Sequence, residues 1–315
     1  MTRFRSLTLI LATALVVATL AALPAPTGAA KGPSDEEIAK IKAACETLKA
    51  RVQPKKPRKV LVYSVSHGYF HTAIPYGKAA IPLMGEATGA FEATVSDDPA
   101  MFEPDRLKQF DAVFFNNANR DVFRPANFAK LPAEEKKKVE KRDAHLKASF
   151  RNWLAEGHGI AATHAACNMF REWPEFGQIL GSRFWNHPWG AGSTVIMKVE
   201  EPDHPLCAAF DAKRFPIVDE VYQLNEPYAR DLCRVLVSID TERTDLEKVR
   251  DRIRRTDGDF AMTYIKTYGQ GRVFYNAWGH MHELFWNPMV LQHWLDGVQY
   301  ALGDLKADAT PSAKK

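Results

Sequence analysis

The segment that most constrains the fold is residues 159–164, a short run of small and apolar side chains that ends in His164. A run of this length between two stretches of helical character is typical of a strand buried in a parallel sheet. In open α/β sheets, ligands bind in the crevice beyond the carboxyl ends of the strands. His67 and His280 also follow apolar runs. We therefore expect His67, His164 and His280, from three strands, to share one edge of a sheet.

The order of the expected elements predicts how the sheet is built. In the first half, strands and helices alternate, and parallel neighbours need such crossover helices, so the pattern predicts a doubly wound α/β sheet. We expect strands at 60–66, 91–96, 111–117 and 159–164, and helices at 34–51, 72–89, 132–156 and 165–180. The second half predicts an antiparallel extension of the same sheet, with strands at 193–200, 217–224, 234–240, 260–267 and 272–277 and a closing helix at 287–302.

The first 30 residues have the pattern of a secretory signal peptide. Arg3 and Arg5 precede an apolar run over residues 7–23, and small residues follow it. The alternative is an uncleaved membrane anchor, because the run approaches the roughly 20 residues that span a bilayer. Two prolines after the run favour cleavage near Ala29 or Ala30. We expect an exported protein, periplasmic or secreted, with no membrane association after cleavage.

The remaining chain divides into three parts. Residues 31–58 form an N-terminal helix and a linker, and Ser34 with Glu37 matches a capping box at the start of that helix. Residues 59–303 form one domain. The Ala- and Lys-rich residues 304–315 predict a disordered tail.

Charge and cysteine content narrow the class of protein. The formal net charge is +4, and removal of Arg3 and Arg5 with the leader leaves +2. The arginine cluster at 250–255 is interrupted by acidic residues, which is typical of a solvated face and makes nucleic acid a poor partner. The four cysteines lack the close spacing of a metal site. Export leaves a Cys207–Cys233 disulfide open, but so few cysteines in a long chain favour buried thiols.

Two histidine segments at strand ends carry candidate chemistry. His67 lies in a loop that continues to His71, where the next helix begins, and imidazole can act as acid, base or metal ligand. His164 occupies the turn where many layered hydrolases place a nucleophile, but the turn residue is not Ser or Cys. Cys167 comes one helical turn too late and is interpreted as a packed thiol.

Two further segments add carboxylate and aromatic groups. Residues 184–190 form an aromatic loop in which Trp185 and Trp189 suit the apolar faces of sugars, while His187 can bond hydroxyls. On the expected strand around Glu220, side chains alternate between faces, so Glu220 and Tyr222 share a face that Asp219 does not. Only one face can line the site, and we favour Glu220 with Tyr222.

The alternatives for these groups are ordinary structural roles. The aromatic loop could simply cover the core, and Glu220 could pair with an arginine. His280 and His282 with an acid could form part of a site for a divalent metal such as Zn²⁺, although the spacing alone leaves the cofactor unknown.

At these residues the chain resembles the ThuA-like (trehalose utilisation) family, which shares the class I glutamine amidotransferase-like fold. The resemblance covers residues 59–303 and rests on the histidine segments, on residues 184–188 and 219–222, and on the run 271–280. It implies a three-layer, flavodoxin-like, mostly parallel sheet with helices on both faces. It also implies sugar catabolism, in particular steps on 3-keto-glycosides, without an amidotransferase cysteine.

The preferred hypothesis is an exported carbohydrate-processing enzyme, a lyase, isomerase or hydrolase and not an amidotransferase. We expect His67, His164, Glu220 and His280 to supply acid–base or metal-assisted chemistry, since a keto group acidifies the neighbouring C–H bonds. We expect substrate contacts from His71, Trp185, His187, Trp189 and Tyr222. The alternative is a non-catalytic sugar-binding module. The substrate is a small carbohydrate in either case, and the sequence leaves the oligomeric state open.

Overall fold

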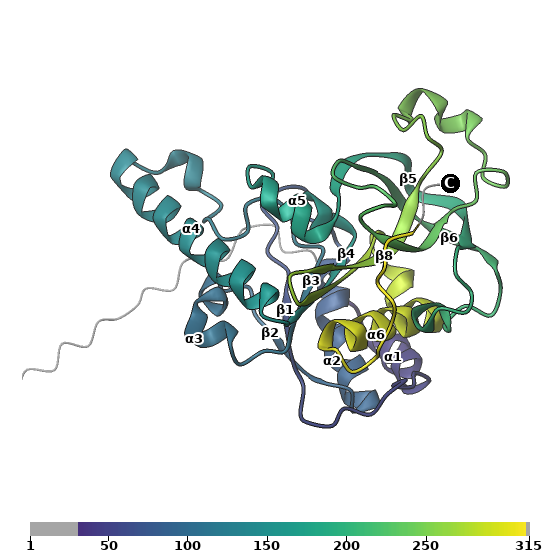
Figure 1. The fold of residues 1–315 in the computed structure, drawn as a ribbon, viewed down its shortest axis with the longest axis horizontal. Helices are drawn as coiled ribbons and strands as arrows, with labels where there is room; N and C mark the ends of the chain where they lie inside the picture. Colours follow the sequence, from purple (N-terminus) through teal and green to yellow (C-terminus); the bar gives the residue numbers. More distant parts are fainter. Residues whose placement is uncertain (1–30, 313–315) are drawn as a thin grey trace, which may run out of the picture. The chain divides into compact units, whose positions relative to one another are not determined.

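The computed structural model describes residues 31–312. The expected signal peptide, residues 1–30, lies outside the described part, as do residues 313–315. Residues 31–312 contain one sheet of nine strands in the order β2-β1-β3-β4-β9-β8-β7-β5-β6, flanked by helices (Figure 1). The expected mixed α/β fold, with a mostly parallel core and an antiparallel extension, is confirmed.

The parallel part of the sheet has the flavodoxin-like order. Its strands are β1 (Lys59–Tyr63), β2 (Glu92–Val95), β3 (Ala112–Asn116), β4 (Gly159–Thr163) and β9 (Gly271–Asn276). Every residue of β3 and β4 is buried, as expected for strands that are covered by helices on both faces. The antiparallel part consists of β5 (Arg183–Val199), β6 (Arg214–Asn225), β7 (Arg234–Ile239) and β8 (Ala261–Tyr268).

Helices cover the two faces of the parallel strands (Figure 1). One face carries α1 (Asp35–Glu46), α2 (Ile74–Thr88) and α6 (Pro288–Leu302), and the other carries α3 (Pro104–Leu107), α4 (Ala133–Ala155) and α5 (Pro174–Leu180). Short 3-10 helices occupy Pro99–Phe102, Phe128–Lys130, His164–Asn168, Pro205–Cys207, Glu247–Arg252 and His282–Trp286. None of the described helices is long and apolar enough to cross a membrane.

Local sequence explains where several elements begin and how closely they pack. The capping box of α1 is present, since Glu37 N–H donates to Ser34 Oγ at 3.3 Å and Ser34 N–H donates to the Glu37 carboxylate at 2.8 Å. Gly159 lets α6 approach β4, because a Cβ atom there would lie 2.0 Å from the carbonyl oxygen of Ala301. This contact packs α6 closely against β4, the strand that His164 follows.

Three expectations about elements are corrected. The helix expected at 165–180 is a 3-10 turn followed, after an interval, by α5, because Phe170 adopts a φ of +48° and Pro174 starts a new helix. The aromatic loop expected at 184–190 lies within β5. Its register against β6 shifts three times between Phe184 and Ser193, which removes the regular alternation that marks a strand.

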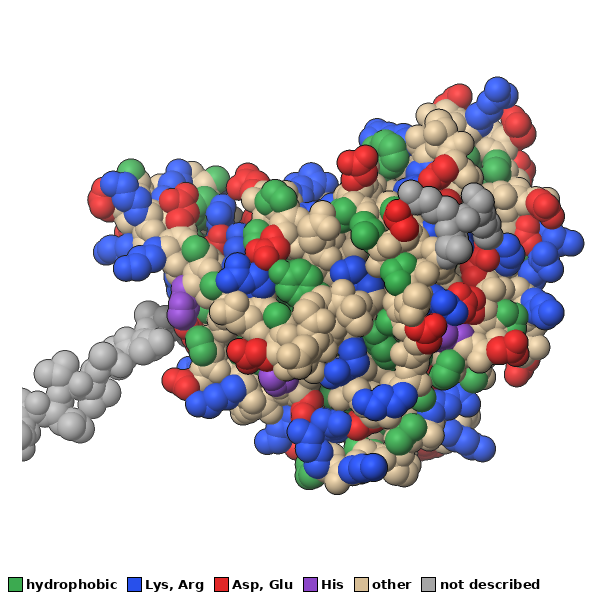
Figure 2. Space-filling model, viewed as in Figure 1, with side chains coloured by type: hydrophobic (Ala, Val, Ile, Leu, Met, Phe, Trp, Pro, Cys, Tyr) green, Lys and Arg blue, Asp and Glu red, His purple; other side chains and the backbone are tan. Residues whose placement is uncertain are grey.

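The third correction concerns the C-terminal tail. Residues 304–312 are held against the domain rather than free: Ser312 N–H donates to the Cys233 carbonyl at 3.0 Å, and His204 Nε2 lies 3.1 Å from the Asp308 carbonyl oxygen. Cys233 and the other three cysteines are free and buried. Basic and acidic side chains are interspersed over the face that Figure 2 shows.

Candidate functional site

His164 is fixed by the end of β4 and by the neighbouring strand β9. The residue is fully buried and adopts a φ of +45°, a left-handed conformation that is costly for a side chain of this kind and is found where the surroundings enforce it. Its Nδ1 lies 2.8 Å from the carbonyl oxygen of Ala277, so Nδ1 carries the proton and donates it to that oxygen. The Tyr222 ring stacks on the imidazole with centroids 4.0 Å apart. Nε2 of His164 is thereby aimed at the site.

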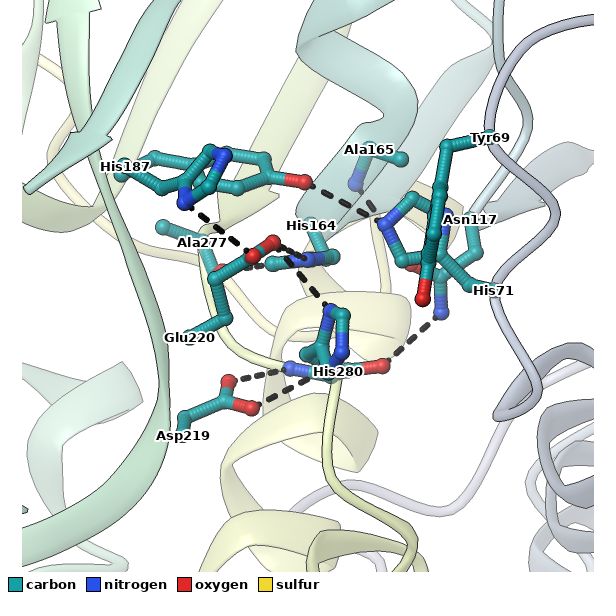
Figure 3. Close-up of polar contacts among 12 residues, drawn as sticks. Tyr69, His71, Asn117, His164, Ala165, His187, Asp219, Glu220, Ala277 and His280 are labelled. Carbon is teal, nitrogen blue, oxygen red and sulfur yellow. Dashed lines mark hydrogen bonds and ion pairs between the residues drawn. The ribbon is translucent and has the colours of Figure 1, made fainter. Parts of the chain in front are cut away.

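Glu220 on β6 lies at the centre of the group (Figure 3). Its Oε2 atom is 3.4 Å from Nε2 of His164 and 3.2 Å from Nδ1 of His280, and its Oε1 atom is 3.2 Å from Nδ1 of His187 on β5. The Glu220 side chain is 12% exposed, whereas that of His187 is 48% exposed. One carboxylate therefore links two enclosed imidazoles to a third that solvent reaches.

Asp219, the residue before Glu220, holds the segment that carries His280. Its completely buried carboxylate accepts hydrogen bonds from the backbone N–H groups of Gly279, His280 and Met281 at 2.9, 3.1 and 2.8 Å. Gly279 has a φ of +131°, which favours glycine at this turn. Burial raises the pKa of Asp219, and the backbone donors and nearby imidazoles oppose that rise.

His71, between β1 and α2, completes the group from the opposite side. It is buried, and the Tyr222 hydroxyl lies 3.3 Å from its Nε2 atom. The centroids of the His71, His164 and His280 rings are 4.9, 5.2 and 5.3 Å apart in pairs. One ligand atom from each of these imidazoles and one from Glu220 all lie within 4.8 Å of one another. This set of three nitrogens and one carboxylate oxygen is the kind that divalent transition metals bind.

Burial and mutual contact set the charges of these groups. Burial, together with the neighbouring His164 and His280, lowers the pKa of His71 to about 2, so His71 is neutral. Burial alone would raise the pKa of Glu220, but His164 and His280 outweigh it and hold the pKa well below its usual range. Glu220 likewise raises the pKa of His280 against the effect of burial. The group thus has a permanent negative charge surrounded by imidazoles.

Six of the nine residues singled out from the sequence come together here: His71, His164, His187, Glu220, Tyr222 and His280. His67 lies outside the group with an exposed side chain, because β1 ends at Tyr63 and the loop returns to the site only at His71.

The two tryptophans are also separate from the group of six. Trp189 is buried against Phe260, with ring centroids 5.6 Å apart, and therefore belongs to the core. Trp185 is half-buried, with the Arg254 guanidinium 6.0 Å from its ring centroid.

Two supporting residues escaped the sequence reasoning. Asp219 was assigned to the face away from the site, yet it holds the His280 segment through the backbone. Asn117, after β3, has a φ of +52° and donates from Nδ2 to the Gly279 carbonyl at 3.0 Å. The available signal for Asn117 was the pair of polar residues, Asn116 and Asn117, that ends an otherwise apolar strand. For Asp219 the signal was its position next to Glu220 in the sequence.

Comparisons with known proteins agree with this fold. The structure resembles that of a ThuA-like protein from Bacteroides uniformis, with a TM-score of 0.55 and 21% identity over 77% of this chain and 93% of that one. It also resembles a ThuA-like protein from Parabacteroides merdae, with a TM-score of 0.53 and 16% identity over 82% of this chain and 95% of that one. No curated protein matches the sequence. The trehalose utilisation model matches residues 59–301, and the chain therefore belongs to the trehalose utilisation (ThuA) family.

Proposed function

We propose that this protein is an exported enzyme that acts on oxidised glycosides, in which a sugar ring carries a 3-keto group. The observation that carries the proposal is the contact of one carboxylate, Glu220, with imidazoles from three different segments. A purely structural carboxylate needs one cationic partner, not three imidazoles. The family's description, trehalose utilisation, supports a carbohydrate substrate. The basic and apolar pattern of residues 1–30 supports export.

The proposed reaction begins with proton removal beside the keto group. The C–H bond at the adjacent carbon breaks, its proton passes to a base, and the electron pair forms an enolate with the carbonyl oxygen. His187 is the base we assign, because it is half exposed and imidazole exchanges protons near neutral pH. Glu220 Oε1, 3.2 Å from Nδ1 of His187, orients that ring, as carboxylates do in other histidine bases.

Aromatic side chains beside the group support a sugar as the ligand. The Tyr69 ring is 65% exposed, and its centroid lies 4.9 Å from that of His71 and 6.1 Å from that of His280. Its position is held because Ser66 Oγ and Asn119 Nδ2 both donate to the Tyr69 carbonyl, at 3.0 and 3.3 Å. A fixed, exposed aromatic face suits the apolar face of a pyranose ring. The sequence reasoning did not single out Tyr69.

The test is hydrogen exchange on a 3-keto-glucoside such as 3-keto-trehalose in D₂O, followed by mass spectrometry together with substrate consumption. We expect the wild-type protein to introduce deuterium beside the keto group. His187→Ala should lower the exchange rate by about 100-fold or more, the usual contribution of a general base.

The matched control is His145→Ala, an exposed histidine on α4 that pairs with Glu103 and should leave the rate unchanged. A wild-type protein that binds the keto-glucoside but neither exchanges nor consumes it would establish the sugar-binding module instead. A rate unaffected by His187→Ala would remove that residue from the reaction.

A further inference from the structure

Three buried imidazole nitrogens of the site have no hydrogen-bond partner among the described residues, and the proposed acid–base reaction does not explain this. Within residues 31–312, Nε2 of His164, Nδ1 of His280 and Nδ1 of His71 are buried without a hydrogen-bond partner. Buried polar atoms in folded proteins are satisfied in the great majority of cases, so three in one group require an explanation. Two of them lie 3.4 and 3.2 Å from the same carboxylate oxygen without hydrogen-bond geometry.

The tautomer of His164 sharpens this point. Because Nδ1 donates to the Ala277 carbonyl, the neutral ring presents the lone pair of Nε2 to Glu220. A lone pair facing a carboxylate at this distance is repulsive unless a positive charge lies between them. His280 faces the same Oε2 atom, so one cation placed among the rings would satisfy both nitrogens and the carboxylate at once.

We propose that His71, His164, His280 and Glu220 bind one divalent transition-metal ion, with Zn²⁺ the best match to three imidazoles and a carboxylate. The ligand atoms lie within 4.8 Å of one another and would draw together to the roughly 3.3 Å that separates the ligands of a tetrahedral zinc ion. The proposal deepens the proposed function, because a metal ion at this place would stabilise the enolate oxygen. His187 touches the other carboxylate oxygen and stays outside the ligand set.

The proposed ligands also have the hydrogen-bond partners that usually orient the ligands of a metal site. Ligand histidines typically donate their second nitrogen to a carbonyl or carboxylate, which fixes the ring and its tautomer. The Ala277 carbonyl does this for His164, and the Tyr222 hydroxyl contacts His71. Asp219 holds the backbone of His280 through three N–H groups. The ligands are thus already oriented by buried partners that belong to the chain.

The test measures metal binding by the purified full chain, without any substrate. The protein is stripped with a chelator, titrated with Zn²⁺ by calorimetry, and analysed for bound metal after gel filtration. We expect about one ion per chain. His164→Ala and, as a variant that preserves shape, Glu220→Gln should each weaken binding by about 100-fold or more, beyond the loss typical of supporting residues. Co²⁺ bound in place of Zn²⁺ should show the visible absorption of a low-coordinate site, and His280→Ala should abolish it.

The matched control is His145→Ala, an exposed histidine on α4 that pairs with Glu103, contacts none of the proposed ligands and should leave zinc affinity unchanged. Far-ultraviolet circular dichroism confirms that each variant is folded. The metal site would be overturned if the wild-type protein bound no stoichiometric Zn²⁺, Co²⁺ or Mn²⁺. It would also be overturned if both His164→Ala and Glu220→Gln kept the zinc affinity of the wild type. Because no keto-glucoside is present, this result is independent of the exchange experiment.

Discussion

The two halves of the sheet position the side chains of the candidate site in different ways. The parallel strands β3 and β4 are buried along their whole length, and His164 at the end of β4 is completely enclosed. The β5–β6 hairpin is irregular in register, and it carries Glu220 and the half-exposed His187. The parallel half therefore supplies the enclosed His164, while the hairpin supplies His187, which solvent reaches.

The largest expected change in stability comes from a residue of the β5–β6 hairpin, and it tests whether that part of the hairpin belongs to the hydrophobic core. Trp189→Ala should lower the free energy of unfolding by about 4 kcal/mol, because it empties a buried site against Phe260. Trp185→Ala removes a half-buried ring with one cation–π contact and should cost about 1 kcal/mol. Urea denaturation measures both. Equal losses would mean that the two tryptophans do not differ in burial as the structure has them.

The second prediction compares one glycine from each half. Gly159→Ala should lower the free energy of unfolding by about 3 kcal/mol, because the new methyl group meets the Ala301 backbone at 2.0 Å and α6 must move. Gly190→Ala in the hairpin meets nothing within 4 Å and should change it by less than about 0.5 kcal/mol. Thermal and urea unfolding measure both variants. If Gly159→Ala destabilised the protein no more than Gly190→Ala does, the close packing of α6 on β4 would be contradicted.

The same difference explains how much of the structure could be predicted from the sequence. Strands β3 and β4 were placed within one residue at each end, because a continuous apolar run bounded by polar residues specifies a buried strand by itself. The sequence pattern of the first part of β5, in contrast, predicts a loop. The register shifts of β5 against β6 depend on pairing with residues much further along the chain, such as Phe184 with Leu224 and Trp189 with Val221, which no local pattern encodes.

The candidate site follows the same division. His164 and His280 were identified because strand ends in an α/β sheet share one edge, and Glu220 and Tyr222 because strand residues alternate. His67 was favoured over His71 because it is nearer to its strand, but only the fold of the intervening loop determines which imidazole returns to the site. Asp219 acts through backbone groups some 60 residues further along the chain, a contact that side-chain alternation cannot reveal.

The smallest expected effect is a change in the pH dependence of stability. It distinguishes His293, a buried histidine of the core, from His164, a buried histidine of the candidate site. His293 on α6 resembles His164: it is fully buried, and its Nδ1 lies 2.8 Å from a backbone carbonyl oxygen, that of Leu206. Its other neighbours are aromatic, with the Phe210 and Phe274 rings 4.8 and 5.2 Å away, and no carboxylate approaches Nε2 among the described contacts. Such a ring can only be a neutral member of the core.

Burial lowers the pKa of His293 from 6.5 to about 4, so between these values the unfolded chain binds a proton that the folded chain does not. Stability from this residue is therefore complete above about pH 6.5 and is lost as the pH falls, by roughly 2.5 kcal/mol between pH 7.5 and 4.5. His293→Phe keeps a ring in place without an ionisable group, and urea unfolding across this range should show a shallower pH dependence than the wild type. An unchanged slope would mean that His293 binds its proton equally in the folded and the unfolded chain, and the contrast with His164 would then have to rest on geometry alone.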